Sequence, residues 1–213
     1  MIVSNQQELL SAIKSSTPEQ GPAIVITIGN PVEGILRPVS TVKGHLNSND
    51  IRLLTKWRNQ FAKSFLTEFN ATESGTERWL TDIVGPDDRR ILFMVDDVTG
   101  RPFGSMGLAL INWENRFAEA DAIVRGAYAP PGTMKNALNI MLKWAKNQLN
   151  LSKFRVRVRS DNTALDFYRK FGFQEIKRVR LRRVDEPNVI RWVEDISIMS
   201  DVPSLVYMIY ECL

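Results

Sequence analysis

Residues 118–173 decide the fold, and they read AEADAIVRGAYAPPGTMKNALNIMLKWAKNQLNLSKFRVRVRSDNTALDFYRKFGF. The pattern predicts a strand, a Pro/Gly turn at residues 130–132, and an amphipathic helix over about 132–149. An alternating strand (153–159) and a short helix (163–170) follow. A strand that passes through a glycine turn into a helix start directs free backbone N–H groups at one point, which suits an anion such as a pyrophosphate.

Composition limits the class of protein. With 213 residues, 44% of them hydrophobic, the chain can bury a sizeable core, and we expect one domain over 1–213 with an N-terminal extension of about 1–33. No apolar run reaches the roughly 18–20 residues that span a bilayer, and no signal-peptide pattern opens the chain. The single cysteine, Cys212, excludes an intrachain disulfide, which agrees with a reducing cytoplasm. One cysteine and one histidine, His45, argue against a metal site, so none is predicted.

The sequence outside residues 118–173 predicts further helices and strands. Periodicity predicts helices at 6–13 and 50–65 and a third helix opened by a Ser74/Glu77 capping box. Antiparallel strands are expected at 90–95, 103–111 and 117–124, with earlier strands at 23–28 and 35–38. Strands at 173–183 and 205–212, joined by a long loop over 185–204, close the chain. The prediction is an α+β fold with a mixed, mostly antiparallel twisted sheet and helices on both faces.

Basic residues gather on two of the predicted strands. Arg155, Arg157 and Arg159 share one face, and a second group follows at Lys177, Arg178, Arg180, Arg182 and Arg183. One interpretation is a solvated sheet face. Another is a surface for phosphates, either those of a bound cofactor or those of a phosphorylated substrate. Nucleic acid ranks third, because no aromatic residues interleave with the arginines.

Three signatures together point to a known family. The strand, turn and helix described above are followed by Phe167-Tyr168 and then by Phe171-Gly172-Phe173, and Trp57-Arg58-Asn59 stands on the helix at 50–65. This order resembles the GNAT N-acetyltransferase superfamily, well over 118–173 and loosely over 35–210. Among its branches, the resemblance is greatest to acetyltransferases of bacterial amino-sugar nucleotides and of ribosomal proteins.

The resemblance implies acetyl-CoA as the cosubstrate. It places the pantetheine arm along the strand that holds Ile123, Val124 and Arg125, and Asn162, one residue late for the family asparagine that precedes the tyrosine, is a further implied CoA-binding residue. The pyrophosphate loop of the family corresponds to residues 129–134, where only Gly132 matches the family pattern. Pro130 and Pro131 remove two backbone donors from that loop. The implied phosphate-binding residues are Pro131, Gly132, Thr133, Met134, Lys135 and Asn136.

The resemblance also implies the chemistry. Tyr168 corresponds to the family tyrosine that can protonate the departing thiolate, and a buried packing residue is the less favoured alternative. A protonated amine must lose a proton before it attacks, and Glu119 or Asp121, on one face of their strand, can take it; the alternative is a solvated edge pair. Arg58, Asn59 and Glu68 fall where the family shapes its acceptor site.

The predicted function is transfer of an acetyl group to a primary amine, with the amino group of a nucleotide-linked sugar favoured by the basic strands. Protein N-termini, including those of ribosomal proteins, are the alternative acceptors. A non-catalytic module that binds acyl-CoA, or RNA and the ribosome, is the alternative from another class. The expected partners are acetyl-CoA and a small-molecule amine, for which a phosphorylated amine is one candidate. Neither a membrane nor nucleic acid is expected as a partner, and the protein is expected to be a monomer or a homodimer.

Overall fold

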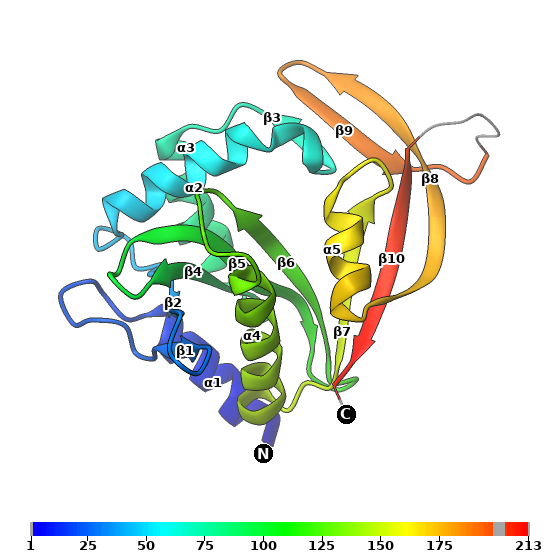
Figure 1. Ribbon diagram of the computed structural model, residues 1–213. Coiled ribbons are helices and arrows are strands. Elements are labelled where there is room, and N and C mark those ends of the chain that lie inside the picture. Colours follow the sequence, from blue (N-terminus) through cyan, green and yellow to red (C-terminus); the bar gives the residue numbers. More distant parts are fainter. Residues whose placement is uncertain (1, 198–202, 213) are drawn as a thin grey trace.

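The computed structural model describes residues 2–197 and 203–212, and Figure 1 shows a twisted sheet flanked by helices. The first half contains α1 (Ile2–Lys14), β1 (Ile26–Ile28), β2 (Gly34–Pro38), α2 (Ser48–Gln60), β3 (Thr67–Phe69), α3 (Glu73–Arg78), β4 (Ile91–Asp97) and β5 (Pro102–Asn112). The second half contains β6 (Phe117–Arg125), α4 (Thr133–Leu149), β7 (Lys153–Arg159), α5 (Ala164–Phe171), β8 (Gln174–Glu186), β9 (Val189–Glu194) and β10 (Ser204–Glu211). A 3-10 turn (Ala62–Ser64) follows α2, and a π-helix (Trp79–Val84) continues α3.

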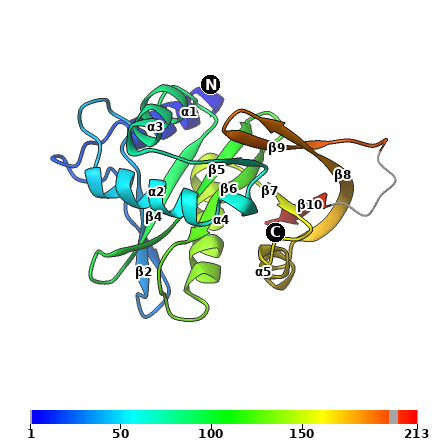
Figure 2. The ribbon, with the colours of Figure 1, turned by 90° about the horizontal axis from the view of Figure 1, so that it is seen from above.

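The sheet has ten strands in the order β1-β2-β4-β5-β6-β7-β10-β8-β9-β3. Every neighbouring pair of these strands is antiparallel except β6 and β7, which are parallel. Figure 2 shows α4 and α5 on one side of the sheet and α3 on the other. The predicted α+β fold, with its mostly antiparallel sheet, is confirmed.

Alternation along β4 explains how the two helical layers are held. Phe93 belongs to the larger core and meets Trp144 of α4 edge-on at 5.4 Å between ring centroids. Leu92 and Met94 point to the other face and pack in a smaller cluster with Trp57 of α2. The predicted inner face of α4 is buried as expected, at Leu138, Met141, Leu142, Ala145 and Leu149.

The parallel pair β6–β7 separates soon after it starts. Its registered pairs are Phe117 with Lys153, Ala118 with Phe154 and Glu119 with Arg155, and none follow in the described chain. Figure 1 shows the two strands close together near the C-terminus and apart at their other ends. Beyond the last pair, β6 carries a bulge against β5, where Ala122 adopts a φ of 53°. The splay leaves one edge of β6 without a strand partner over its second half.

Several sequence-based boundaries were wrong. The expected long loop over 185–204 contains β9, which forms a hairpin with β8 around Asn188, at a φ of 63°; residues 198–202 of that range lie outside the described residues. The helix predicted over 50–65 ends at Gln60, so Phe65 leaves the helix face. The N-cap of α3 is Thr72 rather than Ser74, because the Thr72 side chain accepts a hydrogen bond from the Gly75 N–H, and Asn47 caps α2 in the same way.

The segment expected to be an N-terminal extension packs against the rest of the fold. Leu10 and Ile13 of α1 are buried in the larger core, and β1 forms the first strand of the sheet. The ammonium of Lys14 donates to the carbonyls of Val84 and Asp87, at 3.0 and 2.6 Å, and so caps the end of the π-helix.

Candidate functional site

A cavity of about 490 Å³ fills the space where β6 and β7 separate, and we call it the β6–β7 cavity. One wall is β6 from Glu119 to Arg125, and the other is formed by β7 and the start of α5. Most of the predicted site residues line it together: Tyr168, Glu119, Asp121, Ile123, Val124, Arg125, Met134 and Asn162.

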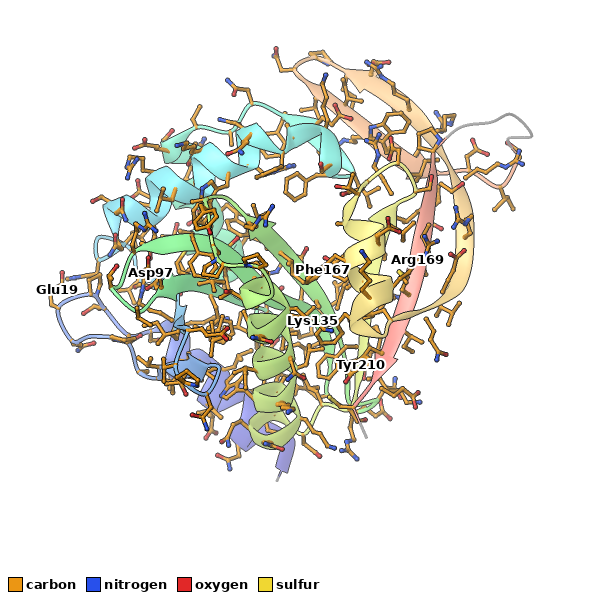
Figure 3. All side chains as sticks on the ribbon, viewed as in Figure 1. Glu19, Asp97, Lys135, Phe167, Arg169 and Tyr210 are labelled. Atoms are coloured by element: carbon orange, nitrogen blue, oxygen red, sulfur yellow. The ribbon has the colours of Figure 1, made fainter. Side chains whose placement is uncertain are left out.

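The rest of the predicted site lies beside this cavity rather than in its wall. Pro131, Gly132, Thr133, Lys135 and Asn136 stand at the start of α4, around Met134, and are not among the lining residues. Figure 3 shows Lys135 on the α4 side of the space between α4 and α5, and Phe167 pointing into that space from α5.

The start of α4 offers fewer backbone donors than predicted. Gly132 has a φ of 93°, which turns the chain into the helix, but the Thr133 N–H already donates to the Pro130 carbonyl at 3.2 Å. The N–H groups of Gly132, Met134 and Lys135 have no acceptor within the described part of the chain. The Asn136 side chain is committed elsewhere, because its amide donates to Glu33 Oε2 at 2.9 Å. Three N–H groups therefore remain for an anion.

Asn162 has a structural role in the wall of the β6–β7 cavity. Its Oδ1 accepts from the Ala164 N–H at 2.9 Å, which caps α5, and its Nδ2 donates to the Ser64 carbonyl at 3.3 Å. The residue therefore ties the loop after β7 to the turn after α2, across the cavity.

Tyr168 is 7% exposed and forms edge-on contacts with Phe167 and Phe173, at 5.3 and 5.6 Å between ring centroids. Its hydroxyl has no hydrogen-bond partner among the described residues. Burial, with a smaller contribution from the charge of Asp121, raises the pKa of Tyr168 well above its ordinary value. The hydroxyl is therefore protonated at neutral pH and can act as a proton donor.

Glu119 is bound by two arginines. Its carboxylate accepts from Arg155 Nη2 at 2.8 Å and from Arg157 Nε at 2.8 Å, and the residue is 6% exposed. The expected solvated edge pair is therefore wrong for Glu119, because both its oxygens are buried in ion pairs. Both carboxylate oxygens of Glu119 are thus already engaged as hydrogen-bond acceptors.

The third arginine of β7 is also paired. Arg159 bonds Asp161 at 2.7 Å and Glu68 at 3.1 Å, and its guanidinium lies 4.2 Å from the centroid of the Trp192 ring. Glu68 also accepts from Trp192 Nε1 at 2.6 Å. The expected solvated face of β7 is thus a set of ion pairs, and its charges are already balanced by carboxylates.

Asp121 differs from Glu119 in its surroundings. Its side chain is 45% exposed, and its nearest cation is Arg90, with Nη1 3.9 Å from Oδ2. The bulge at Ala122 lets Asp121 and Ala122 face the same side of the sheet, where both line a second cavity.

This second cavity, of about 720 Å³, lies between α2, α3 and β6, and we call it the α2–β6 cavity. Aromatic side chains form much of its wall: Trp57, Phe65, Phe69 and Trp79. Arg58, Arg78, Arg90 and Asp121 are its charged residues. Phe65, Asp121, Ala122 and Val124 line both cavities, so the two cavities meet at β6.

Sequence reasoning missed most of the α2–β6 cavity. Trp57 and Phe65 belong to the apolar periodicity that predicted the helix over 50–65, and Trp79 was placed on the next predicted helix, a pattern that does not distinguish a cavity wall from a core. Of the expected acceptor residues, Arg58 lines the cavity, and Asn59 fixes its rim through two hydrogen bonds to Ala71, at 2.7 and 3.0 Å.

Comparison with known proteins identifies the family. The sequence model of the Acetyltransferase (GNAT) domain matches residues 44–174, which is more than half of the chain. The chain belongs to the GNAT acetyltransferase family. A search of curated protein sequences gave no significant match.

Solved structures agree with this GNAT assignment. A spermidine N-acetyltransferase from Vibrio cholerae in complex with CoA and spermine superposes with a TM-score of 0.64 at 20% identity, over 84% of this chain and 95% of that one. A probable acetyltransferase (GNAT family) from Chromobacterium violaceum gives 0.66 at 14% identity, over 93% and 89%. An acetyltransferase (GNAT family) from Bacillus anthracis gives 0.62 at 13% identity, over 88% and 98%. At these identities the likeness establishes the fold.

The family assignment confirms the expected activity class, acetyl-CoA-dependent N-acetyl transfer, at the level of the family. The two GNAT branches expected from the sequence remain predictions. Among the described residues, no helix combines the length and the apolar character that crossing a bilayer requires.

Proposed function

We propose that this GNAT protein transfers the acetyl group of acetyl-CoA to a primary amine, with the pantetheine arm in the β6–β7 cavity and the amine in the α2–β6 cavity. The observation that carries the proposal is the meeting of the two cavities at β6, where Asp121, Ala122 and Val124 line both. A thioester carbonyl at this junction is open to an amine from the other side of the strand.

The second half of β6 suits the pantetheine arm. It has no strand partner on the β7 side, so its backbone groups are available to the amides of the arm. The three N–H groups left at the start of α4 would receive the pyrophosphate.

In the proposed reaction the amine nitrogen forms a bond to the acetyl carbon while the C–S bond breaks. Asp121 accepts the proton that the amine loses, directly or through a water, because it is the exposed carboxylate at the junction. Tyr168 gives its hydroxyl proton to the departing thiolate. Glu119 keeps Arg155 and Arg157 in place and is not the base in this scheme.

The choice among acceptors changes with the structure. The preference for nucleotide-linked sugars rested on the basic strands, and Arg155, Arg157 and Arg159 are now paired with carboxylates. The same pairing removes the main support for a module that binds RNA or the ribosome. Peptide N-termini remain an alternative class of acceptor.

A thermal shift with acetyl-CoA tests the proposal first. Acetyl-CoA at about 100 times its Kd should stabilise the fold by roughly 2.7 kcal/mol. Thiol release should then rise when a suitable amine is added. An unchanged unfolding temperature at millimolar acetyl-CoA would refute the transferase assignment, whereas binding without turnover of any amine class would favour a non-catalytic acyl-CoA-binding module.

A further inference from the structure

The α2–β6 cavity carries an excess of positive charge. Three arginines line it, Arg58, Arg78 and Arg90, against one carboxylate, Asp121. Arg78 is exposed and has no ion pair among the described residues. The charge is therefore not balanced by the wall of the cavity itself.

Arg58 is a largely buried cation without a bonded carboxylate. Its Cζ lies 3.9 Å from the ring centroid of Phe65 and 4.6 Å from that of Phe69, and Nη2 donates to the Thr67 carbonyl. Nη1 is buried and has no hydrogen-bond partner in the part of the chain that the structure describes. Burial lowers the pKa of Arg58 to about 10, although the charges of Asp121 and Glu68 act in the opposite direction.

Arg90 also lacks a closely bonded carboxylate among the described residues. Its contacts with carboxylates are long, 3.7 Å from Nε to Asp87 and 3.9 Å from Nη1 to Asp121, and among the described residues its buried Nε has no hydrogen-bond partner. Such an unsatisfied donor costs free energy unless a ligand completes it.

Other arginines with little exposed surface form close ion pairs with carboxylates. Arg37 bonds Asp50 at 2.7 Å, Arg155 bonds Glu119 at 2.8 Å, and Arg159 bonds Asp161 at 2.7 Å. The incomplete pairing of Arg58 and Arg90 is thus particular to the α2–β6 cavity.

We propose that the acceptor is a primary amine that also carries an anionic group, a carboxylate or a phosphate, and that this group docks on Arg58 and Arg90 while the amine faces Asp121. The inference rests on the proposed function and narrows its substrate class. Because Nη1 of Arg58 is buried, docking turns the guanidinium toward the cavity. The aromatic wall, with Trp57 and Trp79, suits an acceptor with apolar or planar surface. A polyamine would instead bring several positive charges to three guanidiniums.

Matched amines test the proposal by thiol release with acetyl-CoA. Tyrosine is compared with tyramine for the carboxylate, phosphoethanolamine with ethanolamine for the phosphate, and spermidine serves as the polycation. The anionic member of at least one pair should have a kcat/KM at least tenfold higher, and the pair that shows it identifies the anion. Equal or faster turnover of the neutral amines or of spermidine overturns the proposal while leaving the transferase function intact.

Substitutions of single arginines test where the anionic group of the acceptor docks. Arg58→Gln and Arg90→Gln should each lower, tenfold or more, the ratio of kcat/KM for the anionic amine to kcat/KM for its neutral partner. Arg52→Gln is the matched control, since Arg52 is an exposed arginine on α2 that lines neither cavity. If Arg58→Gln fails to fold, Arg90→Gln alone decides the test. Equal losses for both members of a pair would contradict docking of the anion on these arginines.

A binding measurement keeps the test independent of turnover. Calorimetry at saturating CoA should show binding of phenyl phosphate or benzoate, but not of benzylamine, and Arg90→Gln should weaken that binding tenfold or more. If neither anion binds to the CoA complex, the proposal fails even when no amine in the panel is acetylated. A failure of CoA itself to bind would instead count against the proposed function.

Discussion

The indole of Trp57 lies against the backbone of Gly126, so closely that a Cβ on Gly126 would stand 2.0 Å from ring atoms of Trp57. Trp57 is 2% exposed and belongs to the small core beneath α2, while Gly126 directly follows β6. The contact therefore seats α2 on the strand that separates the two cavities. Only glycine leaves room for this approach.

Gly126→Ala should lower the free energy of unfolding by about 1–3 kcal/mol, because the indole has to move to admit a methyl group. Chemical denaturation measures the loss. Combining it with Trp57→Ala, which removes the ring, should cost less than the sum of the two single changes. Simple additivity would show that the two residues do not compete for this space.

Tyr168→Phe keeps the ring and its edge-on contacts but removes the hydroxyl. If that hydroxyl protonates the thiolate, kcat should fall by about 10²-fold, the lower end of the range for one acid–base group, since water can partly replace it. Acetyl-CoA binding should hardly change. Tyr128→Phe is the control, because Tyr128 is 79% exposed. Near-wild-type turnover would make Tyr168 a packing residue.

The pH dependence tests the same group. Burial raises the pKa of Tyr168, so the hydroxyl keeps its proton as the pH rises past the ordinary tyrosine value of about 10. A proton donor of this kind should cause no fall in kcat below about pH 10. A kcat profile that loses activity on the alkaline side near pH 8, and does so only in proteins with the hydroxyl, would contradict this assignment.

Substitutions of Glu119 and Asp121 should have different effects, because Glu119 is expected to stabilise the fold and Asp121 to act as the base. Glu119→Gln weakens two charge-assisted ion pairs and should cost about 2 kcal/mol of stability. Asp121→Asn should leave stability within about 0.5 kcal/mol but lower kcat by about 10²–10⁴. Denaturation and steady-state kinetics on both variants decide, and the reverse pattern would make Glu119 the base.

Gly132→Val should raise the KM for acetyl-CoA, because the branched side chain crowds the free N–H groups at the start of α4. It should also cost about 1–2 kcal/mol, since Gly132 has a φ of 93°. Gly100→Val shares that backbone cost, at a φ of 78° with open space around it, and should leave the KM unchanged. Equal kinetics for the two variants would mean that the pyrophosphate binds elsewhere.

Sequence patterns predicted those helices and strands whose formation depends on residues close together in the chain. The alternation of Phe154, Val156 and Val158 and the apolar face of α4 were sufficient for the central layers. The pairing of Glu119 with Arg155 follows from the parallel register of β6 on β7, which no short-range signal encodes. The hairpin of β8 and β9 was missed because its strands are rich in charged residues, although Asn188 after Pro187 was a turn signal.

The candidate site shows the same division. The Phe167-Tyr168 motif led to the β6–β7 cavity through the resemblance to the GNAT family, and both residues line that cavity. The α2–β6 cavity depends on the end of α2 at Gln60, which releases Phe65 from the helix face to meet Arg58. That ending could not be predicted, because apolar residues continue at helical spacing beyond it.

The pairing of β3 with β9 has a consequence for how the protein is made. In the described chain β3 has β9 as its strand partner, with Thr67 opposite Arg191, and Phe69 of β3 lines the α2–β6 cavity. The two strands are far apart in the sequence, so a ribosome has to synthesise the chain as far as β9 before this wall can form. The α2–β6 cavity is therefore completed after β4, β5 and α4 can already have packed, and a nascent chain stopped before β9 would hold a core but not the finished cavity.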